Sequence, residues 1–112
     1  MHSDPQAALL DIRDNIALAK QFTAGMTYED FAGNTLVFYA VIRCLEIISE
    51  ASRRLPDELK MRNSNIPWAQ IAGAGNVYRH DYEDVQRRLV WGTVTERLAE
   101  LERVVDCEIS VR

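Results

Sequence analysis

The chain has 112 residues, of which 47% are apolar and 27% are charged, and it contains only 5 glycines and 3 prolines. This composition excludes disordered and collagen-like chains, and the length predicts a single domain, residues 1–112, with a sizeable core. The net charge of −4 argues against a protein that coats DNA by neutralising phosphates. Any chemistry on nucleic acid therefore needs a local basic patch.

No apolar run approaches the roughly 18 residues that span a bilayer, and the first residues lack the pattern of a signal peptide. We therefore expect a cytoplasmic protein that makes no membrane contact. Its two cysteines, Cys44 and Cys107, are far apart, form no CxxC pair and fall in apolar periodic segments. They are predicted to act as small hydrophobic residues rather than to form a disulfide or a zinc site.

Helical periodicity begins near the start of the chain. Residues 3–5, Ser-Asp-Pro, supply a capping side chain and a proline for a first turn. Apolar residues then recur at three- and four-residue steps, which predicts an amphipathic helix ending near Gly25. Its apolar positions are Leu9, Ile12, Ile16, Ala19 and Phe22.

A second cap at Thr27–Asp30 predicts a long helix from Tyr28 or Phe31 to Leu55, ending before a proline. Its apolar residues fall on two adjoining stripes that together exceed the arc needed for one core contact. One contains Phe38, Val41, Leu45, Ile48 and Leu55, and the other contains Val37, Ala40, Cys44, Ile47 and Ala51. Either this helix is packed on both sides within its own bundle, or one stripe contacts a second copy of the chain.

The second half of the chain continues the helical pattern. Residues 56–60 predict a short helical turn, and a third main helix opens at residues 66–68. It carries Gly73 and Gly75 in its interior, each costing up to about 1 kcal/mol relative to alanine, so we expect a close backbone approach or room for a ligand. A last helix should begin between residues 85 and 88 and end near Val105. The predicted fold is an all-α antiparallel bundle of about four long helices plus a short one.

The surroundings of His80 suggest chemistry. Asn76 and Arg79 lie within one helical turn of it, and Tyr78 and Tyr82 form an i,i+4 pair that flanks the patch. A histidine can take the proton of a ribose 2′-hydroxyl, an arginine can hold the phosphate, and an amide can orient either group. A metal site is not expected, because the sequence offers no second His or Cys at ligand spacing.

The residues alone leave other interpretations open. A helical histidine is more often a hydrogen-bonded surface residue, and a phosphate- or nucleotide-binding patch needs the same arginine and amide without catalysis. Glu46 and Glu50 lie one turn apart and either face this patch, remain solvated or pair with a neighbouring arginine, namely Arg43, Arg53 or Arg54. Arg87 and Arg88 either contact RNA or a partner protein, or form the solvated first turn of the last helix.

A set of short segments in a specific order covers nearly the whole chain. In order they are Leu10-Asp11-Ile12, Phe22-Thr23, Ala40 to Ile48, Glu50-Ala51, Leu55-Pro56, Ile66-Pro67-Trp68, Ile71-Ala72-Gly73, Gly75-Asn76, Arg79 to Tyr82 and Val90-Trp91. With this order and spacing the chain resembles the HepT-like family of HEPN-domain proteins, which are toxins of prokaryotic toxin–antitoxin pairs.

The resemblance implies an all-α HEPN fold and a homodimer whose paired active sites face a shared cleft. It further implies an endoribonuclease that cleaves RNA without a metal or other cofactor. The implied partner is a minimal nucleotidyltransferase of the MNT type, which acts as the antitoxin. His80 matches the catalytic histidine of the family motif, and Tyr82 matches the tyrosine that the partner modifies with AMP. The added charge and bulk would block the phosphate-binding patch.

The sequence departs from the family motif at one position. The arginine usually found directly before the asparagine is Gly75 here, and an arginine instead precedes the histidine, as Arg79. Arg79 is expected to replace the missing guanidinium, with Gly75 leaving space for it. If Arg79 points away, the chain is instead expected to be a catalytically weak binding module that dimerises and engages a nucleotidyltransferase.

Overall fold

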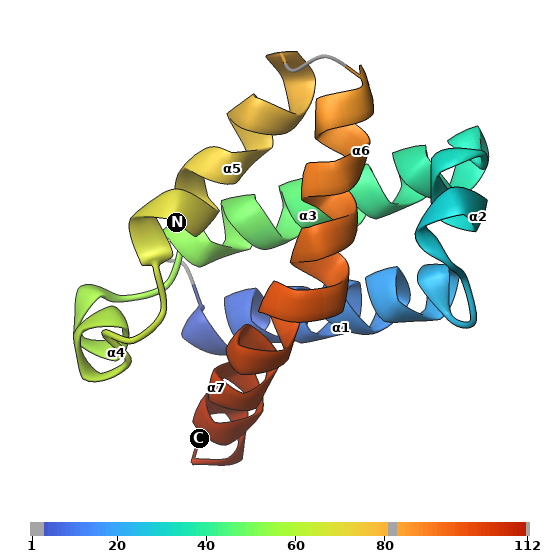
Figure 1. The fold of residues 1–112 in the computed structure, drawn as a ribbon. Coiled ribbons are helices and arrows are strands. Elements are labelled where there is room, and N and C mark those ends of the chain that lie inside the picture. Colours follow the sequence, from blue (N-terminus) through green and yellow to red (C-terminus); the bar gives the residue numbers. More distant parts are fainter. Residues whose placement is uncertain (1–3, 81–82, 112) are drawn as a thin grey trace.

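The structure is a computed structural model that describes residues 4–80 and 83–111, with the backbone alone for residues 75–80 and 83–85. All the elements in this part of the chain are helical, which confirms the predicted all-α fold. In chain order they are α1 (Pro5–Thr23), α2 (Tyr28–Ala32), α3 (Thr35–Arg53), α4 (Asp57–Arg62), α5 (Trp68–His80), α6 (Glu83–Gly92), the π-helical η1 (Thr93–Arg97) and α7 (Leu98–Ser110), as Figure 1 shows.

The first helix begins and ends as its sequence predicts. The side chain of Asp4 accepts a hydrogen bond of 3.0 Å from the backbone N–H of Gln6, and Pro5 occupies the first helical position. The helix ends at Thr23, and Gly25 follows with φ of 75°. This left-handed conformation is easy for glycine and strained for other residues, so Gly25 allows the chain to turn toward α2.

The predicted helix from residue 28 to residue 55 is wrong in one respect, because it is two helices. A capping box between Thr27 and Asp30, with two hydrogen bonds of 3.1 Å, starts α2, which ends at Ala32. Asn34 then caps a new helix, since its side chain accepts a hydrogen bond of 3.0 Å from the backbone N–H of Val37. An asparagine bonded in this way ends one helix and begins another.

The last helix is longer than predicted and contains a π-helical turn. Helical structure runs from Glu83 to Ser110 through η1. Two threonine hydroxyls donate to backbone carbonyls four residues earlier, Thr93 to Leu89 and Thr95 to Trp91, each at 2.8 Å. Such bonds compete with the helix's own ladder, which accounts for the wider turn at this point.

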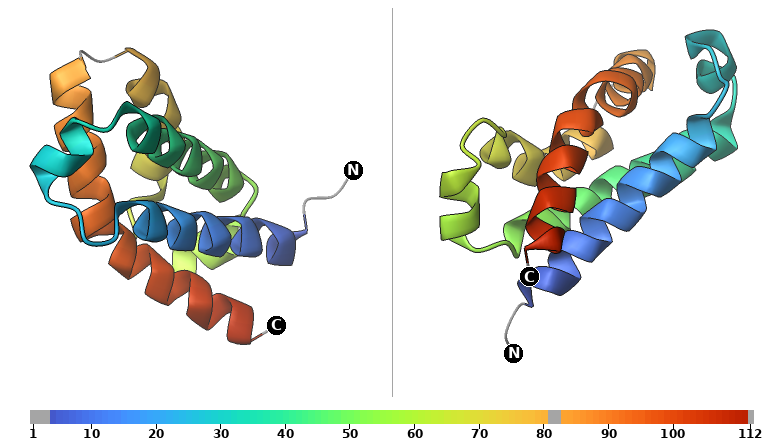
Figure 2. Two further views of the ribbon diagram at one scale, coloured as in Figure 1. Left: turned by 90° about the vertical axis from the view of Figure 1, so that its right-hand side faces the viewer. Right: turned by 90° about the horizontal axis from the view of Figure 1, so that it is seen from below.

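Helix α3 is packed on both sides within its own chain. It lies between α1 and α5, and the run from α6 to α7 crosses the bundle (Figures 1 and 2). All five residues of the first apolar stripe are buried, and Cys44 and Ala51 of the second stripe are buried as well. Val37, Ala40 and Ile47 of the second stripe are half-buried, so this stripe is only partly covered within the chain, and its contact with a second copy stays a prediction.

The outward apolar surface of α3 is formed by other residues. Leu36 is 81% exposed and Tyr39 is 64% exposed, and both precede Arg43 on the solvent-facing side of the helix. Single exposed apolar residues are normal on a protein surface. Two of this size one turn apart form a contiguous apolar surface that a partner could contact.

A polar network attaches α4 to the end of α7. The carboxylate of Glu108, which is buried, accepts hydrogen bonds from Arg62 at 2.7 and 3.0 Å and from Asn63 at 2.9 Å. The hydrogen bond to Glu108 is the main reason that the pKa of Arg62 is raised. The Asn63 carbonyl also accepts a bond of 3.0 Å from the indole of Trp68, so α4 holds the start of α5.

The two cysteines are free and differ in their burial. Cys44 is buried, and this burial raises the pKa of its thiol. Cys107 is exposed, so the prediction that it acts as a small hydrophobic residue is wrong. Within residues 4–80 and 83–111, no helix has both the length and the hydropathy needed to cross a membrane.

Alanine substitutions at two glycines are expected to change the free energy of unfolding in opposite directions. A Cβ on Gly25 or on Gly73 meets no atom within 4 Å, so substitution by alanine changes the backbone energy without a clash. Gly25→Ala is expected to lower the free energy of unfolding by about 1 kcal/mol, because φ is positive. Gly73→Ala is expected to raise it by up to about 1 kcal/mol, because Gly73 lies inside α5. Urea unfolding measures both, and equal signs would contradict this account.

Candidate functional site

The residues predicted to carry chemistry lie at the carboxyl end of α5. The backbone is helical through His80, so Asn76, Arg79 and His80 occupy positions within little more than one turn, as the sequence predicts. Their side chains, that of Tyr78 and the whole of Tyr82 lie outside the described residues. The structure therefore places the positions of this group on α5, and the roles of the side chains stay predictions.

The backbone of α5 is attached to α3 at one carbonyl. The carbonyl oxygen of Ala72 accepts hydrogen bonds from the hydroxyl of Ser49 at 2.9 Å and from the guanidinium of Arg53 at 2.6 and 3.0 Å. Gly73, the next residue, is exposed and has no side chain to cover this carbonyl. These bonds hold the Ala72 turn of α5 against the carboxyl-terminal half of α3. Sequence patterns gave no signal for them, because the acceptor is a backbone atom.

The acidic residues of α3 differ in their environments. Glu46 pairs with Arg43 at 3.5 Å, and its side chain is only 20% exposed, whereas the side chain of Arg43 is 70% exposed. Glu50, one turn later, is exposed. Pairing of Glu46 with Arg43 confirms one of the sequence alternatives.

The two other arginines that the sequence offered as partners for these glutamates bind other groups. Arg53 binds the Ala72 carbonyl, and Arg54 forms an ion pair of 2.8 Å with Asp11 of α1.

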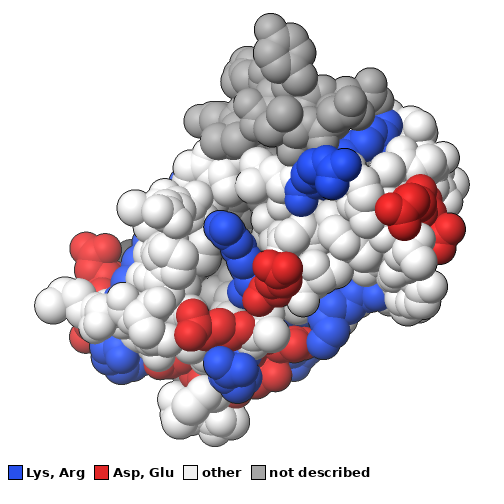
Figure 3. Space-filling view, viewed as in Figure 1, with Lys and Arg blue, Asp and Glu red and all other residues white. Residues whose placement is uncertain are grey.

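The two arginines of α6 both lie over aromatic rings. The guanidinium of Arg87 is 4.2 Å from the ring centre of Phe38, and Arg87 is only 7% exposed. That of Arg88 is 4.7 Å from the ring centre of Tyr28, and Arg88 is exposed. Arg87 is therefore a packing residue rather than a solvated one, and Arg88 is the more accessible cation. Figure 3 shows basic side chains beside the grey region on this face of the molecule.

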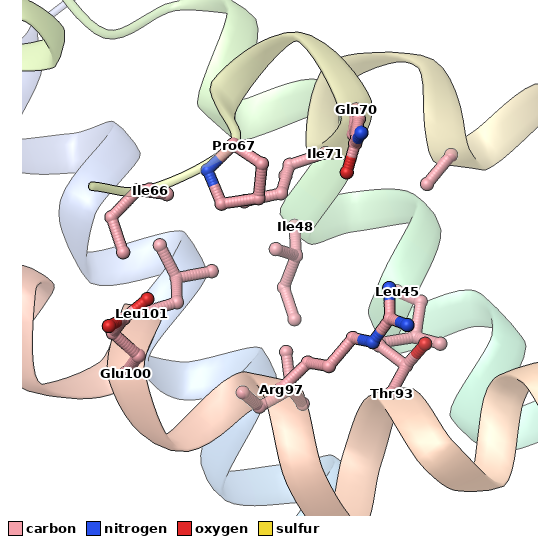
Figure 4. A pocket seen from close by; sticks show the side chains of 12 residues that line it. Leu45, Ile48, Ile66, Pro67, Gln70, Ile71, Thr93, Arg97, Glu100 and Leu101 are labelled. Atoms are coloured by element: carbon pink, nitrogen blue, oxygen red, sulfur yellow. The ribbon is translucent and has the colours of Figure 1, made fainter. Parts of the chain in front are cut away.

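A pocket of about 340 Å³ lies between α3, α5 and the η1–α7 segment (Figure 4). Its walls are mostly apolar, and Arg97 and Glu100 extend from the η1–α7 side toward opposite ends. Among the side chains that the structure describes, those of α5 that line the pocket extend to Ala74, and the position of Asn76 lies two residues and about 200° of rotation further along the helix. The pocket and the Asn76 position thus belong to different faces of α5. Sequence patterns did not indicate this pocket, because it depends on how the helices diverge.

Comparisons with known proteins identify a family for the chain. The family described as Ribonuclease HepT-like matches residues 12–107. A candidate RNase of Methanocaldococcus jannaschii is 34% identical over 103 residues, covering 92% of this chain and 94% of the relative. A candidate RNase of Caldanaerobacter subterraneus is 38% identical over 81 residues, covering 72% of each chain.

A further relative carries a more specific name. It is a Thermococcus cleftensis protein named Probable ribonuclease HepT, 38% identical over 94 residues, and the match covers 84% of this chain and 86% of the relative. No solved structure matches the chain.

Alanine substitutions of the two α6 arginines test whether Arg87 stabilises the fold by packing and Arg88 does not. Arg87→Ala is expected to lower the free energy of unfolding by about 1–2 kcal/mol, because it removes a buried stem and a largely desolvated cation–π contact. Arg88→Ala is the matched control, with an expected loss below about 0.5 kcal/mol at an exposed position. Urea unfolding at neutral pH measures the difference, and equal losses would show that Arg87 is not a packing residue.

Proposed function

Because the chain belongs to the HepT-like ribonuclease family, we propose that it is a metal-independent endoribonuclease and the toxin of a toxin–antitoxin pair. The observation that carries this proposal is the family match over residues 12–107, which includes the turn of α5 that holds Asn76 and His80. The RNase names of the relatives support an RNA substrate for this chain.

In the proposed reaction, His80 takes the proton of a ribose 2′-hydroxyl. The resulting oxygen attacks the adjacent phosphorus, the bond from phosphorus to the 5′-oxygen breaks, and that oxygen is protonated as it leaves. Arg79 binds the phosphate and offsets the charge that grows on its oxygens, and Asn76 orients one of these groups. No step in this sequence requires a metal ion to generate the nucleophile.

The same geometry supports a homodimer. In an in-line displacement the attacking and leaving oxygens lie on opposite sides of phosphorus, so one imidazole cannot reach both of them. A second copy brings a second His80 to the shared cleft, as the family resemblance implies. The exposed Leu36 and Tyr39 of α3 offer apolar surface for this contact.

The proposed antitoxin is a minimal nucleotidyltransferase that attaches AMP to Tyr82. Each AMP adds a negative charge and a bulky group two residues from His80, where RNA phosphate must bind. Electrostatic repulsion and steric exclusion then both oppose RNA binding. Arg88 and Tyr78 are the residues that we assign to contact with RNA or with this partner, whereas Arg87 is buried over the ring of Phe38.

Cleavage of RNA by purified chain in the presence of a chelator tests the proposed activity. The wild-type chain is expected to cut RNA, and His80→Ala is expected to lower the rate by at least about a hundredfold, as loss of a general base does. His2→Ala, the only other histidine substitution, is the control and should leave the rate unchanged. Silence from wild type and variants alike would instead support the non-catalytic binding module.

Modification by the partner is tested separately. Incubation with ATP, magnesium and a minimal nucleotidyltransferase of the proposed MNT type is expected to add mass in AMP units, and intact-protein mass spectrometry measures it. Tyr82→Phe should abolish the addition, because the acceptor hydroxyl is gone. Tyr78→Phe is the matched control and should still be modified. Mass addition that survives Tyr82→Phe would assign the acceptor to another residue.

A further inference from the structure

Two side chains on one face of α3 bind a single backbone atom of α5. The hydroxyl of Ser49 donates to the carbonyl oxygen of Ala72 at 2.9 Å, and Nε and Nη2 of Arg53 donate to the same oxygen at 3.0 and 2.6 Å. Ser49 and Arg53 are four residues apart, so they project from the same face of the helix. Hydrogen bonds from a charged donor are stronger than neutral ones, so Arg53 makes the larger contribution to this attachment.

The bonded carbonyl belongs to the turn that leads into the candidate site. In an α-helix each carbonyl accepts a hydrogen bond from the N–H four residues later, so the partner of Ala72 within the helix is Asn76. The backbone of α5 is helical through His80. A carbonyl oxygen has two lone pairs and therefore accepts from its own helix and from a neighbouring one. Ser49 and Arg53 thus bind the same acceptor as the backbone of a candidate site residue.

The sequence of α5 explains why this helix needs an attachment at the bonded carbonyl. Its first half is held by apolar packing, since Trp68, Ile71 and Ala74 lie against the core. Its second half includes Gly73 and Gly75, and glycine has a low helix propensity. A short helix is marginal in water unless tertiary contacts stabilise it. The bonds from α3 meet α5 where its apolar packing ends and its glycines begin.

We propose that Arg53 is a positioning residue of the candidate site, because it stabilises the helical turn of α5 that carries Asn76 and His80. Ser49 supplies a second, neutral donor to the same carbonyl. A general base and an orienting amide act only in a fixed geometry, and a misplacement of about 1 Å lowers a rate by about a hundredfold. The catalytic part of this proposal rests on the proposed function, whereas the stabilisation of α5 does not.

Direct contact of Arg53 with RNA is the competing role, because this arginine is exposed. A bidentate contact with a phosphate uses two parallel N–H groups on one edge of the guanidinium. In Arg53 the edge formed by Nε and Nη2 is already bound to the Ala72 carbonyl. Binding a phosphate through that edge would require the loss of both bonds, which favours the positioning role.

Amide hydrogen exchange measured by NMR tests the stabilisation of α5 without any RNA. Arg53→Met keeps the aliphatic stem and removes the donors, so the amides of residues 76–80 are expected to exchange at least about tenfold faster. Ser49→Ala should have a smaller effect in the same direction. Arg54→Met is the matched control, because Arg54 pairs with Asp11 of α1, and it should leave these amides unchanged. Unchanged exchange in Arg53→Met would overturn the proposal.

RNA cleavage distinguishes positioning from contact with the substrate. Arg53→Met is expected to lower kcat/KM by about tenfold, mainly through kcat, because the reacting groups are displaced while RNA contacts remain. Adding Gly73→Ala should recover about fivefold of this loss, since alanine favours the helix and its Cβ meets no atom within 4 Å. A loss that Gly73→Ala does not recover, or a loss in KM alone, would assign Arg53 to RNA contact and overturn the positioning role.

The two experiments fail in different ways. If the wild-type chain cuts no RNA while Arg53→Met speeds exchange in α5, the proposed function fails and the stabilisation of α5 by Arg53 stands. If the wild-type chain cuts RNA while exchange in Arg53→Met is unchanged, the role of Arg53 fails and the ribonuclease stands. Gly73→Ala alone is the control for the rescue and should leave kcat/KM unchanged, because the attached turn is already helical.

Discussion

The attachment of α5 to α3 at the Ala72 carbonyl is the constraint on which the candidate site depends. Three hydrogen bonds of 2.6 to 3.0 Å from Ser49 and Arg53 meet at this oxygen. The positions of Asn76 and His80 follow it by four and eight residues, which is about 6 and 12 Å along the helix axis. A helix rotated or shifted at the anchor would move both positions together, so the anchor sets their place relative to α3.

The charge distribution explains how an acidic chain is compatible with a role on RNA. Many of its cations are already engaged within the molecule: Arg54 with Asp11, Lys20 with Glu102, Arg62 with Glu108 and Arg53 with a backbone carbonyl. They contribute little to general attraction of phosphates. In the proposed function, affinity then comes from a few exposed cations, such as Arg88 over the ring of Tyr28. Such a surface favours brief binding at one position over coating of the strand.

Local signals made much of the fold predictable. Caps and periodicity predicted α1, α4 and the start of α5, because these features depend on residues that are neighbours in the sequence. The division of residues 28–53 into two helices was missed, although Asn34 carried the signal as a capping residue behind Gly33. The π-helical turn at Thr93 and the aromatic ring beneath Arg87 depend on hydroxyl and tertiary contacts that no periodicity encodes.

The candidate site was predictable only as a set of positions. The spacing of Asn76, Arg79 and His80 requires a helix through residue 80, and the backbone provides it. What the sequence did not reveal is how α5 is attached to α3, because the bonds from Ser49 and Arg53 end on a backbone carbonyl, that of Ala72.

Two surfaces are candidates for the contact of the proposed dimer: the pocket and the outer face of α3. Their shapes favour the outer face of α3. The pocket between α3, α5 and η1–α7 is concave, and two identical hollows that face each other across a twofold axis leave an unfilled cavity. The outer face of α3 is convex, and Leu36 and Tyr39 project from it. A contact there buries apolar surface from both copies and runs along the helix that anchors each α5.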